Sequence, residues 1–329
     1  MNWPALEEIL PRAVATESPF LKQLLDHVLY GGKGLRPTLV RVCAQFGPYD
    51  PTEVNRVAVA VELVHLASLI HDDILDGATI RRYRPALHCL YGSVPAVLTG
   101  DYLFATAFGL LAQSPRAILN IVAATVRTMC EGEIEQRSVS EPDERTYLDL
   151  IGKKTASLIS AACRCSGILC HLKRSGQENL ARFGWHLGLA YQMADDLLDL
   201  LGHPEELGKP CHQDLSRGII TLPVLRFLEL VPHADRWREK ISRGLTPEEM
   251  EEIIVAVQSL GCCEYARERV REQINLAFSA LEDLPACSAQ DELAWVASQM
   301  LSKIERLDYS GPAQKRAKPK EIAGSEAAV

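Results

Sequence analysis

Apolar residues recur every three to four positions along most of the chain, which is the spacing of helices that bury one face. No stretch of alternating β-branched residues is long enough to predict a sheet. Glycine and proline separate the helical segments, as at Gly31-Gly32 and Gly47-Pro48. The pattern therefore predicts an all-α protein. Its predicted helices are Pro11–Leu29, Glu53–Leu75, Pro95–Leu111, Ala117–Glu131, Glu144–Cys170, Gln177–Leu201, Thr221–Leu230, Pro247–Ser259, Cys262–Leu284 and Asp291–Arg306.

No low-complexity linker divides these segments, so we expect one domain over residues 1–309. Residues 310–329 differ, because basic residues are followed by mostly small ones. That composition is typical of a disordered tail, whose only expected role at a membrane is peripheral contact with an acidic surface. Within the domain, Thr246 followed by Pro247 and acidic residues predicts a capped helix start.

Composition excludes several classes of protein. The 329 residues are 47% hydrophobic, which allows a large core, and the net charge of −8 argues against a nucleic-acid partner. The ten cysteines include no CxxC pair, so we interpret them as reduced, buried thiols that act as small hydrophobic residues, rather than zinc ligands or disulfides. The N-terminal residues lack a signal-peptide pattern, and Glu62 and His65 interrupt the longest apolar stretch, from Val57 to Ile70. We therefore expect a cytoplasmic location.

One acidic pattern, Asp-Asp-x-x-Asp, occurs twice in apolar helical surroundings, about 120 residues apart. A helix places residues i and i+4 on one face, about 6 Å apart along the axis. Paired carboxylates on an apolar helix repel each other unless a cation neutralises them, and Mg²⁺ prefers such oxygen ligands. Two opposing motifs would form a multi-metal site that holds substrate phosphates. The motif residues are Asp72, Asp73 and Asp76, then Asp195, Asp196 and Asp199.

Basic residues near these motifs would suit a diphosphate, because guanidinium groups bind phosphate oxygens in pairs. Taken singly, each is equally explained as a solvated surface charge, and a histidine on an apolar helix is more often a core residue than a ligand. The glycine-rich segment at 31–34 lacks the spacing of a nucleotide-binding P-loop. The candidates are Lys33, Arg36, His65, Arg81, Arg82, Lys154 with Thr155, and Lys209.

These motifs in this order resemble the trans-prenyltransferases, that is, the polyprenyl diphosphate synthases. The resemblance runs from about Gly31 to Leu225. Shorter matches at 47–50, 99–105 and 221–224 resemble the large catalytic component of two-component heptaprenyl diphosphate synthases. The segments that carry the resemblance are Gly-Gly-Lys-x-Leu-Arg-Pro at 31–37, both acidic motifs, Arg-Arg at 81–82, Gly-Asp at 100–101, Gly-Glu-Ile-Glu-Gln at 132–136, Lys-Thr at 154–155, Gln192 and Gly-Lys-Pro at 208–210.

The resemblance implies an isoprenoid synthase fold, a helical bundle around a central cavity, and an Mg²⁺-dependent reaction of an allylic diphosphate with isopentenyl diphosphate. It implies that Asp72, Asp76 and Asp195 ligate Mg²⁺ directly, and that Asp73, Asp196 and Asp199 bind through metal or water. It assigns the allylic diphosphate to Arg81, Lys154 and Lys209. It assigns isopentenyl diphosphate to Lys33, Arg36, His65 and Arg82, with Thr155 and Gln192 beside the reacting carbons.

The size of the product can be predicted sterically. Ala67 and Ser68, one turn below Asp72, are small, where short-chain members of the family place aromatic residues. They leave room for a long chain, although small residues also serve close helix packing. We expect a heptaprenyl product for a quinone side chain such as that of menaquinone, made from farnesyl diphosphate by a dimer that includes a small regulatory subunit.

Three residues depart from the family pattern, and other functions share some of these features. Gly34 stands where a basic residue is usual, and Tyr83 and His212 replace glycines. The main alternative is a self-sufficient homodimeric synthase of geranylgeranyl or octaprenyl type. A class I terpene cyclase shares the first motif but not the second, and a non-catalytic helical subunit would not need intact acidic motifs.

Overall fold

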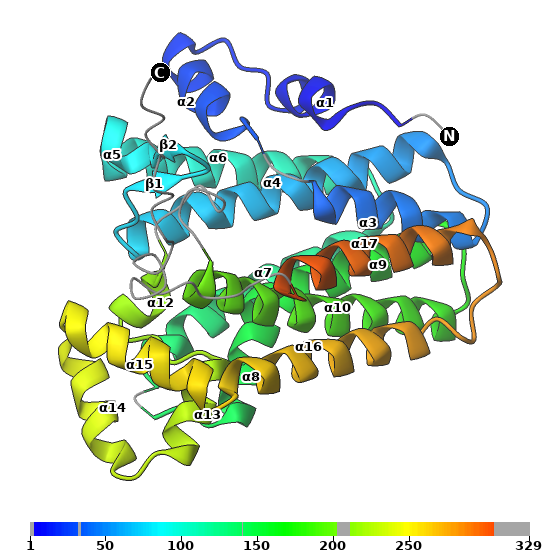
Figure 1. The fold of residues 1–329 in the computed structure, drawn as a ribbon. Coiled ribbons are helices and arrows are strands. Elements are labelled where there is room, and N and C mark those ends of the chain that lie inside the picture. The colour runs from blue at the N-terminus through cyan, green and yellow to red at the C-terminus, as the bar shows by residue number, and fades with distance from the viewer. Residues whose placement is uncertain (1–2, 32–33, 140, 203–210, 306–329) are drawn as a thin grey trace, which may run out of the picture.

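The computed structural model describes residues 3–31, 34–139, 141–202 and 211–305. Most of these residues are helical, and the only strands among them form the antiparallel hairpin β1–β2 of two residues each, in which Arg81 pairs with Arg84 (Figure 1). The all-α prediction is confirmed. The elements in chain order are α1 (Leu6–Ala13), α2 (Pro19–Val28), α3 (Leu35–Cys43), η1 (Ala44–Phe46), α4 (Pro51–Leu75), β1 (Ile80–Arg81), β2 (Arg84–Pro85), α5 (Leu87–Tyr91), α6 (Ser93–Leu111), α7 (Arg116–Gln136), α8 (Glu144–Ile151), η2 (Gly152–Ala156), α9 (Ser157–Leu169), α10 (Arg174–Leu201), α12 (Gln213–Ser216), α13 (Leu222–Leu230), α14 (Ala234–Arg243), α15 (Pro247–Ser259), α16 (Cys262–Ser279) and α17 (Ser288–Glu305).

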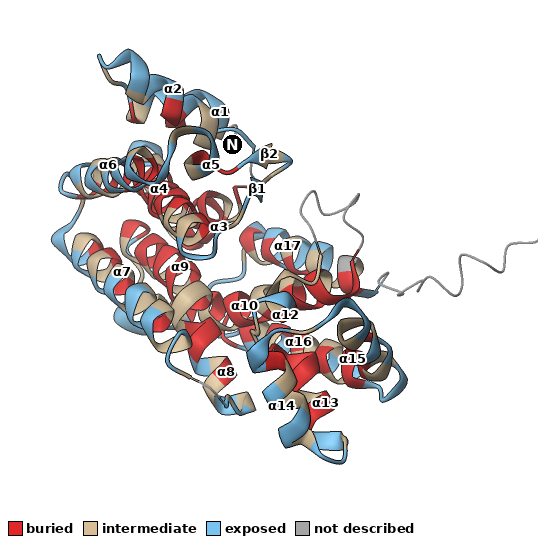
Figure 2. Cartoon of the chain, turned by 90° about the vertical axis from the view of Figure 1, so that its left-hand side faces the viewer, coloured by how far each residue is buried: buried red, intermediate tan, exposed pale blue. Residues whose placement is uncertain are grey.

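The hydrophobic core consists of two clusters that meet at α3 and α9. One cluster joins α10 to the C-terminal helices, and the other joins α4, α6 and α7 to the N-terminal helices. Helix α9 serves both, since Ile159 belongs to the first cluster and Leu158 to the second. Figure 2 shows the burial concentrated along α4, α9 and α10. The two helices that carry the acidic motifs are thus fixed on either side of α9.

Helix α4 is buried on all sides over most of its length, as expected of a helix that is apolar all round. Helix α6 packs along it and is also strongly apolar. By length and composition alone, α6 could cross a membrane, but one such helix is weak evidence for a span; 33% of its apolar window is buried against the rest of the protein. Core helices of soluble proteins meet the same criterion. The packing of α6 on α4 therefore places it within the bundle.

Several predicted boundaries are confirmed and others are wrong. Helix α15 begins as predicted, with Thr246 accepting from the N–H of Glu249 at 3.2 Å in a reciprocal capping box. The single helix predicted for Pro11–Leu29 is two, because Ser18 caps a new start at α2. Helix α3 was missed because its charged residues, such as Arg36, face inward, and α14 because it is mostly polar.

The cysteines agree with the interpretation as thiols. All ten are free; six are buried, among them Cys163, Cys165 and Cys170, but Cys89 and Cys130 are exposed, so the expected burial is confirmed only in part. The tail at 310–329 lies outside the described residues, so the predicted division of the chain stays a prediction.

Candidate functional site

Both acidic motifs lie in the last turns of long helices, α4 and α10, whose C-terminal ends lie at the same end of the bundle (Figure 1). The last carbonyl groups of a helix create a negative potential, so carboxylates there are doubly unfavourable. Basic side chains are therefore expected near these carboxylates, and the structure shows which residues supply them.

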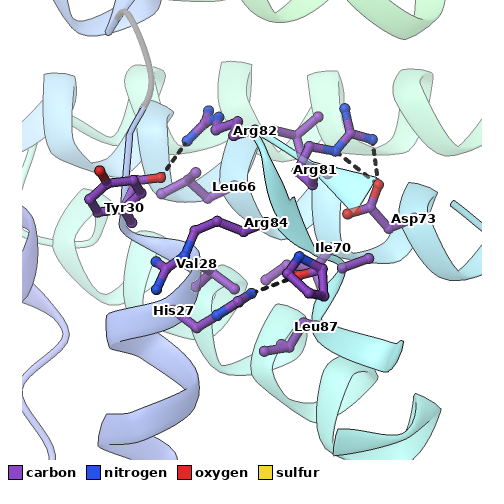
Figure 3. Close-up of a pocket in the computed structure, with 13 residues that line it drawn as sticks. His27, Val28, Tyr30, Leu66, Ile70, Asp73, Arg81, Arg82, Arg84 and Leu87 are labelled. Carbon is purple, nitrogen blue, oxygen red and sulfur yellow. Dashed lines mark hydrogen bonds and ion pairs between the residues drawn. The ribbon is translucent and has the colours of Figure 1, made fainter. Parts of the chain in front are cut away.

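The first motif contacts the hairpin. Asp73 is buried and accepts hydrogen bonds from both Nε and Nη2 of Arg81, the first at 2.9 Å (Figure 3). Burial raises the pKa of Asp72 to about 6; the charge of Lys154 opposes this, and the nearby carboxylate of Glu133 adds to it. A bound cation strongly stabilises the ionised form of such a carboxyl group.

Asp76 is held by two arginines from different parts of the chain. Its Oδ1 accepts from Arg137 at 3.4 Å, and its Oδ2 accepts from Arg217 at 3.2 Å. Arg137 lies just after α7 and also pairs with Glu133 at 2.9 Å. The carboxylate is thus neutralised by protein groups from both sides.

The second motif is tied into a buried hydrogen-bond network. Asp196 accepts from the hydroxyl of Tyr147 at 2.6 Å and from Nε2 of Gln192 at 2.8 Å. Burial, reinforced by the charge of Asp214, raises the pKa of Asp196 to about 8. Asp199 is also buried and accepts from the N–H of Asp214 at 3.1 Å. These contacts fix the helix end.

Arg81 is the residue that relates the two motifs. Burial alone would lower its pKa, but the hydrogen bonds to Asp73 and the charges of Asp72 and Asp195 outweigh burial and raise it. Carboxylates of both motifs therefore lie near one guanidinium.

A one-turn π-helix, η2, presents the next two candidates. Lys154 pairs with Glu133 at 2.6 Å and donates to Gln136, and Thr155 donates to Oε1 of Gln192 at 2.7 Å. Such π-bulges are frequent at functional sites because they redirect side chains within a helix. The close approach of α7 to η2 depends on Gly132, since a Cβ at this position would lie 2.7 Å from Cβ of Lys153.

On the other side of the hairpin lies a cluster of basic residues, of which Arg36 is buried and His65 and Arg82 are half-buried. Arg36 is 8% exposed, and its Nε has no hydrogen-bond partner among the described residues. Burial lowers the pKa of Arg36, while the charge of the equally buried Glu62 raises it. Burial and the charges of Arg36 and Arg82 hold the pKa of His65 well below its ordinary value. A buried guanidinium with an open donor suits an anionic ligand.

The turn of the hairpin is strained. Arg82 and Tyr83 have φ values of 51° and 63°, the left-handed region that favours glycine. Arg82 donates to the carbonyl oxygen of Tyr30 at 3.4 Å (Figure 3) and to that of Gly31. Tyr83 therefore does not prevent the turn. The contacts of Arg81 with Asp73 and of Arg82 with the backbone hold the two arginines on opposite sides of the hairpin.

Lys33 and Lys209 lie outside the described residues. Ala67 is fully buried on α4, and Ser68 is half-buried with its hydroxyl donating to the carbonyl of His65 at 2.9 Å. Neither lines the pocket between α2, α4 and the hairpin, so their role in chain length stays a prediction.

The described carboxylates do not form a ready-made metal cage. Among the residues that the structure describes, no three acidic, histidine or cysteine side chains lie close enough to surround one ion. Mg²⁺ is usually held by one or two carboxylates together with waters and phosphate oxygens. The raised pKa of Asp72 and the all-oxygen donor set fit Mg²⁺ if a diphosphate supplies the remaining ligands.

Sequence reasoning missed several residues of this site. Glu133 and Gln136 lie in a segment that carried the family resemblance. Their spacing on one helix face is the signal that could have identified them as partners of Lys154. Three further residues had no signal in the sequence, because each contacts a motif residue that is far away along the chain. They are Tyr147, Arg137 and Arg217.

Comparison with known proteins decides the family. Residues 18–258 match the protein family described as polyprenyl synthetase. The chain belongs to this family. It is 37% identical over 296 residues to heptaprenyl diphosphate synthase component 2 of Geobacillus stearothermophilus, covering 87% of this chain and 91% of that protein. It is 32% identical over 274 residues to octaprenyl diphosphate synthase of Escherichia coli, covering 80% and 85%.

Solved structures agree with this assignment. A polyprenyl synthase from Caulobacter crescentus, in complex with calcium and isoprenyl diphosphate, has a TM-score of 0.85 at 30% identity and covers 90% of this chain and 93% of its own. Heptaprenyl diphosphate synthase from Staphylococcus aureus has a TM-score of 0.84 at 28% identity, covering 90% and 96%. The expected isoprenoid synthase fold and the expected family are confirmed.

Proposed function

We propose that this protein is an Mg²⁺-dependent trans-prenyltransferase that extends an allylic diphosphate with isopentenyl diphosphate. One observation carries the proposal: a single segment contacts both motifs, since the N–H of Asp214 donates to Asp199 at 3.1 Å and Arg217 donates to Asp76 at 3.2 Å. The two acidic motifs therefore face one volume, which a diphosphate and its metal ions fit. Family membership supports the same reaction.

In this proposal the residues around the motifs hold the leaving group. Asp72, Asp76 and Asp195 are the direct metal ligands, and bound Mg²⁺ supplies positive charge that stabilises the departing diphosphate. Arg81 and Lys154 bind its oxygens, with Lys209 beyond the described residues. Asp196, Asp199 and Asp73 keep the helix ends in place and act through metal or water.

The basic cluster on the other side of the hairpin holds the second substrate. Arg36, His65 and Arg82, together with Lys33, bind isopentenyl diphosphate, and the open Nε of Arg36 is a donor ready for a phosphate oxygen. Thr155 and Gln192 border the carbons that join. A proton then leaves to the released diphosphate, since no side-chain base in the described site is aimed there.

We further propose a long-chain, all-trans product of heptaprenyl length for a quinone side chain such as that of menaquinone, with farnesyl diphosphate as primer. Two relatives at 35–37% identity carry the name heptaprenyl diphosphate synthase component 2. The small residues Ala67 and Ser68 support a long product. A homodimeric synthase of geranylgeranyl or octaprenyl type is the second candidate, favoured by the likeness to octaprenyl diphosphate synthase.

We propose a dimer, with a small regulatory subunit as one partner, in the cytoplasm. Helix α6 supports this, because Val94 and Leu98 on its first turns are 71% and 60% exposed. Large exposed aliphatic side chains on one helix face are typical of protein interfaces. The ten free thiols suit a reducing compartment.

The test is the product made from labelled isopentenyl diphosphate and farnesyl diphosphate, with chain length read by chromatography. Heptaprenyl product that requires an added small subunit would support the two-component enzyme. Long-chain product from this chain alone would replace it with the homomeric synthase. The absence of product under both conditions would refute the proposed reaction.

A further inference from the structure

Arg217 is a cation between the two acidic motifs that the sequence analysis did not single out. It follows α12, and its Nη1 donates to Oδ2 of Asp76 at 3.2 Å, across 141 positions of the chain. Its side chain is 27% exposed, so the guanidinium lies at the edge of the site within reach of a ligand.

The segment that carries Arg217 is attached to the second motif. The N–H groups of Asp214 and His212 donate to Asp199, to Oδ2 at 3.1 Å and to the carbonyl at 2.9 Å. The N–H of Ile219 returns to the carbonyl of Asp214 at 2.9 Å, which closes the loop around Arg217. The backbone of Arg217 is therefore fixed by one motif while its guanidinium binds the other.

Asp76 cannot keep both arginines and also ligate Mg²⁺ through a free carboxylate, because the cations compete for the same oxygens. Arg137 can fall back on Glu133, which it already contacts at 2.9 Å on its own helix. Within the described residues, Asp76 is the one ion-pair partner of Arg217. A released guanidinium needs a new anion, and diphosphate oxygens match its donors best.

We propose that Arg217 is a further substrate-binding residue: it neutralises Asp76 in the ligand-free protein and moves its guanidinium onto the allylic diphosphate when substrate and Mg²⁺ bind. The inference rests on the proposed function and extends its binding site. Only hydrogen bonds and ion pairs exchange, and no covalent bond changes. The same side chain thereby stabilises the empty site and contributes to the filled one.

The test compares Arg217→Gln, which removes the charge, with Arg217→Lys, which keeps it. Calorimetric titration with Mg²⁺ alone should show the Gln variant binding about two- to fivefold more tightly, since a partly exposed competitor of Asp76 is gone. The KM for farnesyl diphosphate should rise about tenfold or more, because a charge-assisted hydrogen bond is lost. The KM for isopentenyl diphosphate should stay within about twofold, and the Lys variant should recover part of the farnesyl affinity.

Arg226→Gln is the matched control, because it removes an arginine of similar exposure that pairs with Glu229 at 2.8 Å on α13. It should leave both affinities unchanged. Weaker Mg²⁺ binding in Arg217→Gln, or an unchanged KM for farnesyl diphosphate, would overturn the inference. If wild-type protein makes no product either alone or with an added small subunit, the proposed function fails by itself. Arg217 is then tested by direct titration with farnesyl diphosphate and Mg²⁺, where equal affinity in wild type and Arg217→Gln would overturn it.

Discussion

Replacing Gly188 by alanine tests whether close contact between α10 and the π-helix positions the site. A Cβ on Gly188 would lie 2.5 Å from Cα and 2.8 Å from Cβ of Ala156, the last residue of η2. Ordinary carbon contacts are about 3.5–4.0 Å, so the helices must separate by about 1 Å. Backbone atoms cannot rotate away as a side chain can.

The expected cost follows from two opposing effects. Overpacking a core contact costs about 1–3 kcal/mol, and a backbone clash belongs at the upper end. Alanine recovers about 1 kcal/mol over glycine in a helix interior. We therefore expect Gly188→Ala to lower the free energy of unfolding by about 2 kcal/mol. The separation would also stretch the hydrogen bond from Thr155 to Gln192, now 2.7 Å, and reduce the rate of prenyl transfer.

Gly109→Ala is the matched control, since a Cβ at this exposed position of α6 meets nothing within 4 Å. It should be neutral or stabilise the protein by up to about 1 kcal/mol. Urea unfolding midpoints measured at one protein concentration provide the comparison. A Gly188→Ala protein as stable and as active as Gly109→Ala would refute the close packing of α10 on η2.

Three further changes have defined outcomes. Asp72→Asn should reduce isopentenyl incorporation at least about a hundredfold while raising the unfolding midpoint of the metal-free protein, because it removes a half-buried, partly desolvated charge; a lower midpoint would contradict this desolvation. The pKa of His65 is lowered in the folded protein, so as pH falls the unfolded chain binds a proton at this residue before the folded protein does. The contribution of His65 to the free energy of unfolding should therefore be fully present above about pH 6.5 and be lost as pH falls below that value. His65→Gln should flatten that slope in urea unfolding measured from pH 7 to 5, and an unchanged slope would exclude His65 as its source. Tyr147→Phe should cost about 1–3 kcal/mol, since it removes the donor to buried Asp196, and a neutral effect in urea unfolding would show that this bond adds little.

The sequence predicted the parts of the site that depend on local spacing. The two acidic motifs sit on helices as their i and i+4 positions require, and the helix start at Thr246 follows from its neighbours alone. Helix α3 was hidden because Arg36 and Arg41 are buried there, which reverses the usual relation between charge and exposure.

What the sequence could not predict depends on contacts between distant segments. The contact of Tyr147 with Asp196 spans 49 positions, and that of Arg217 with Asp76 spans 141. The hairpin turn at Arg82 and Tyr83 lacks the glycine or asparagine that marks such turns, because tertiary contacts hold it.

The most direct test of the central claim is the rate at which purified protein, with farnesyl diphosphate and any required small subunit, incorporates labelled isopentenyl diphosphate. The rate is measured with Mg²⁺, after chelation, and with the double variant Asp72→Asn, Asp195→Asn. We expect prenyl product only from wild-type protein with Mg²⁺. Product should be lost after chelation, and the double variant should fold but form none. Equal incorporation by the variant, or incorporation that survives chelation, would contradict the assignment of the reaction to the two acidic motifs.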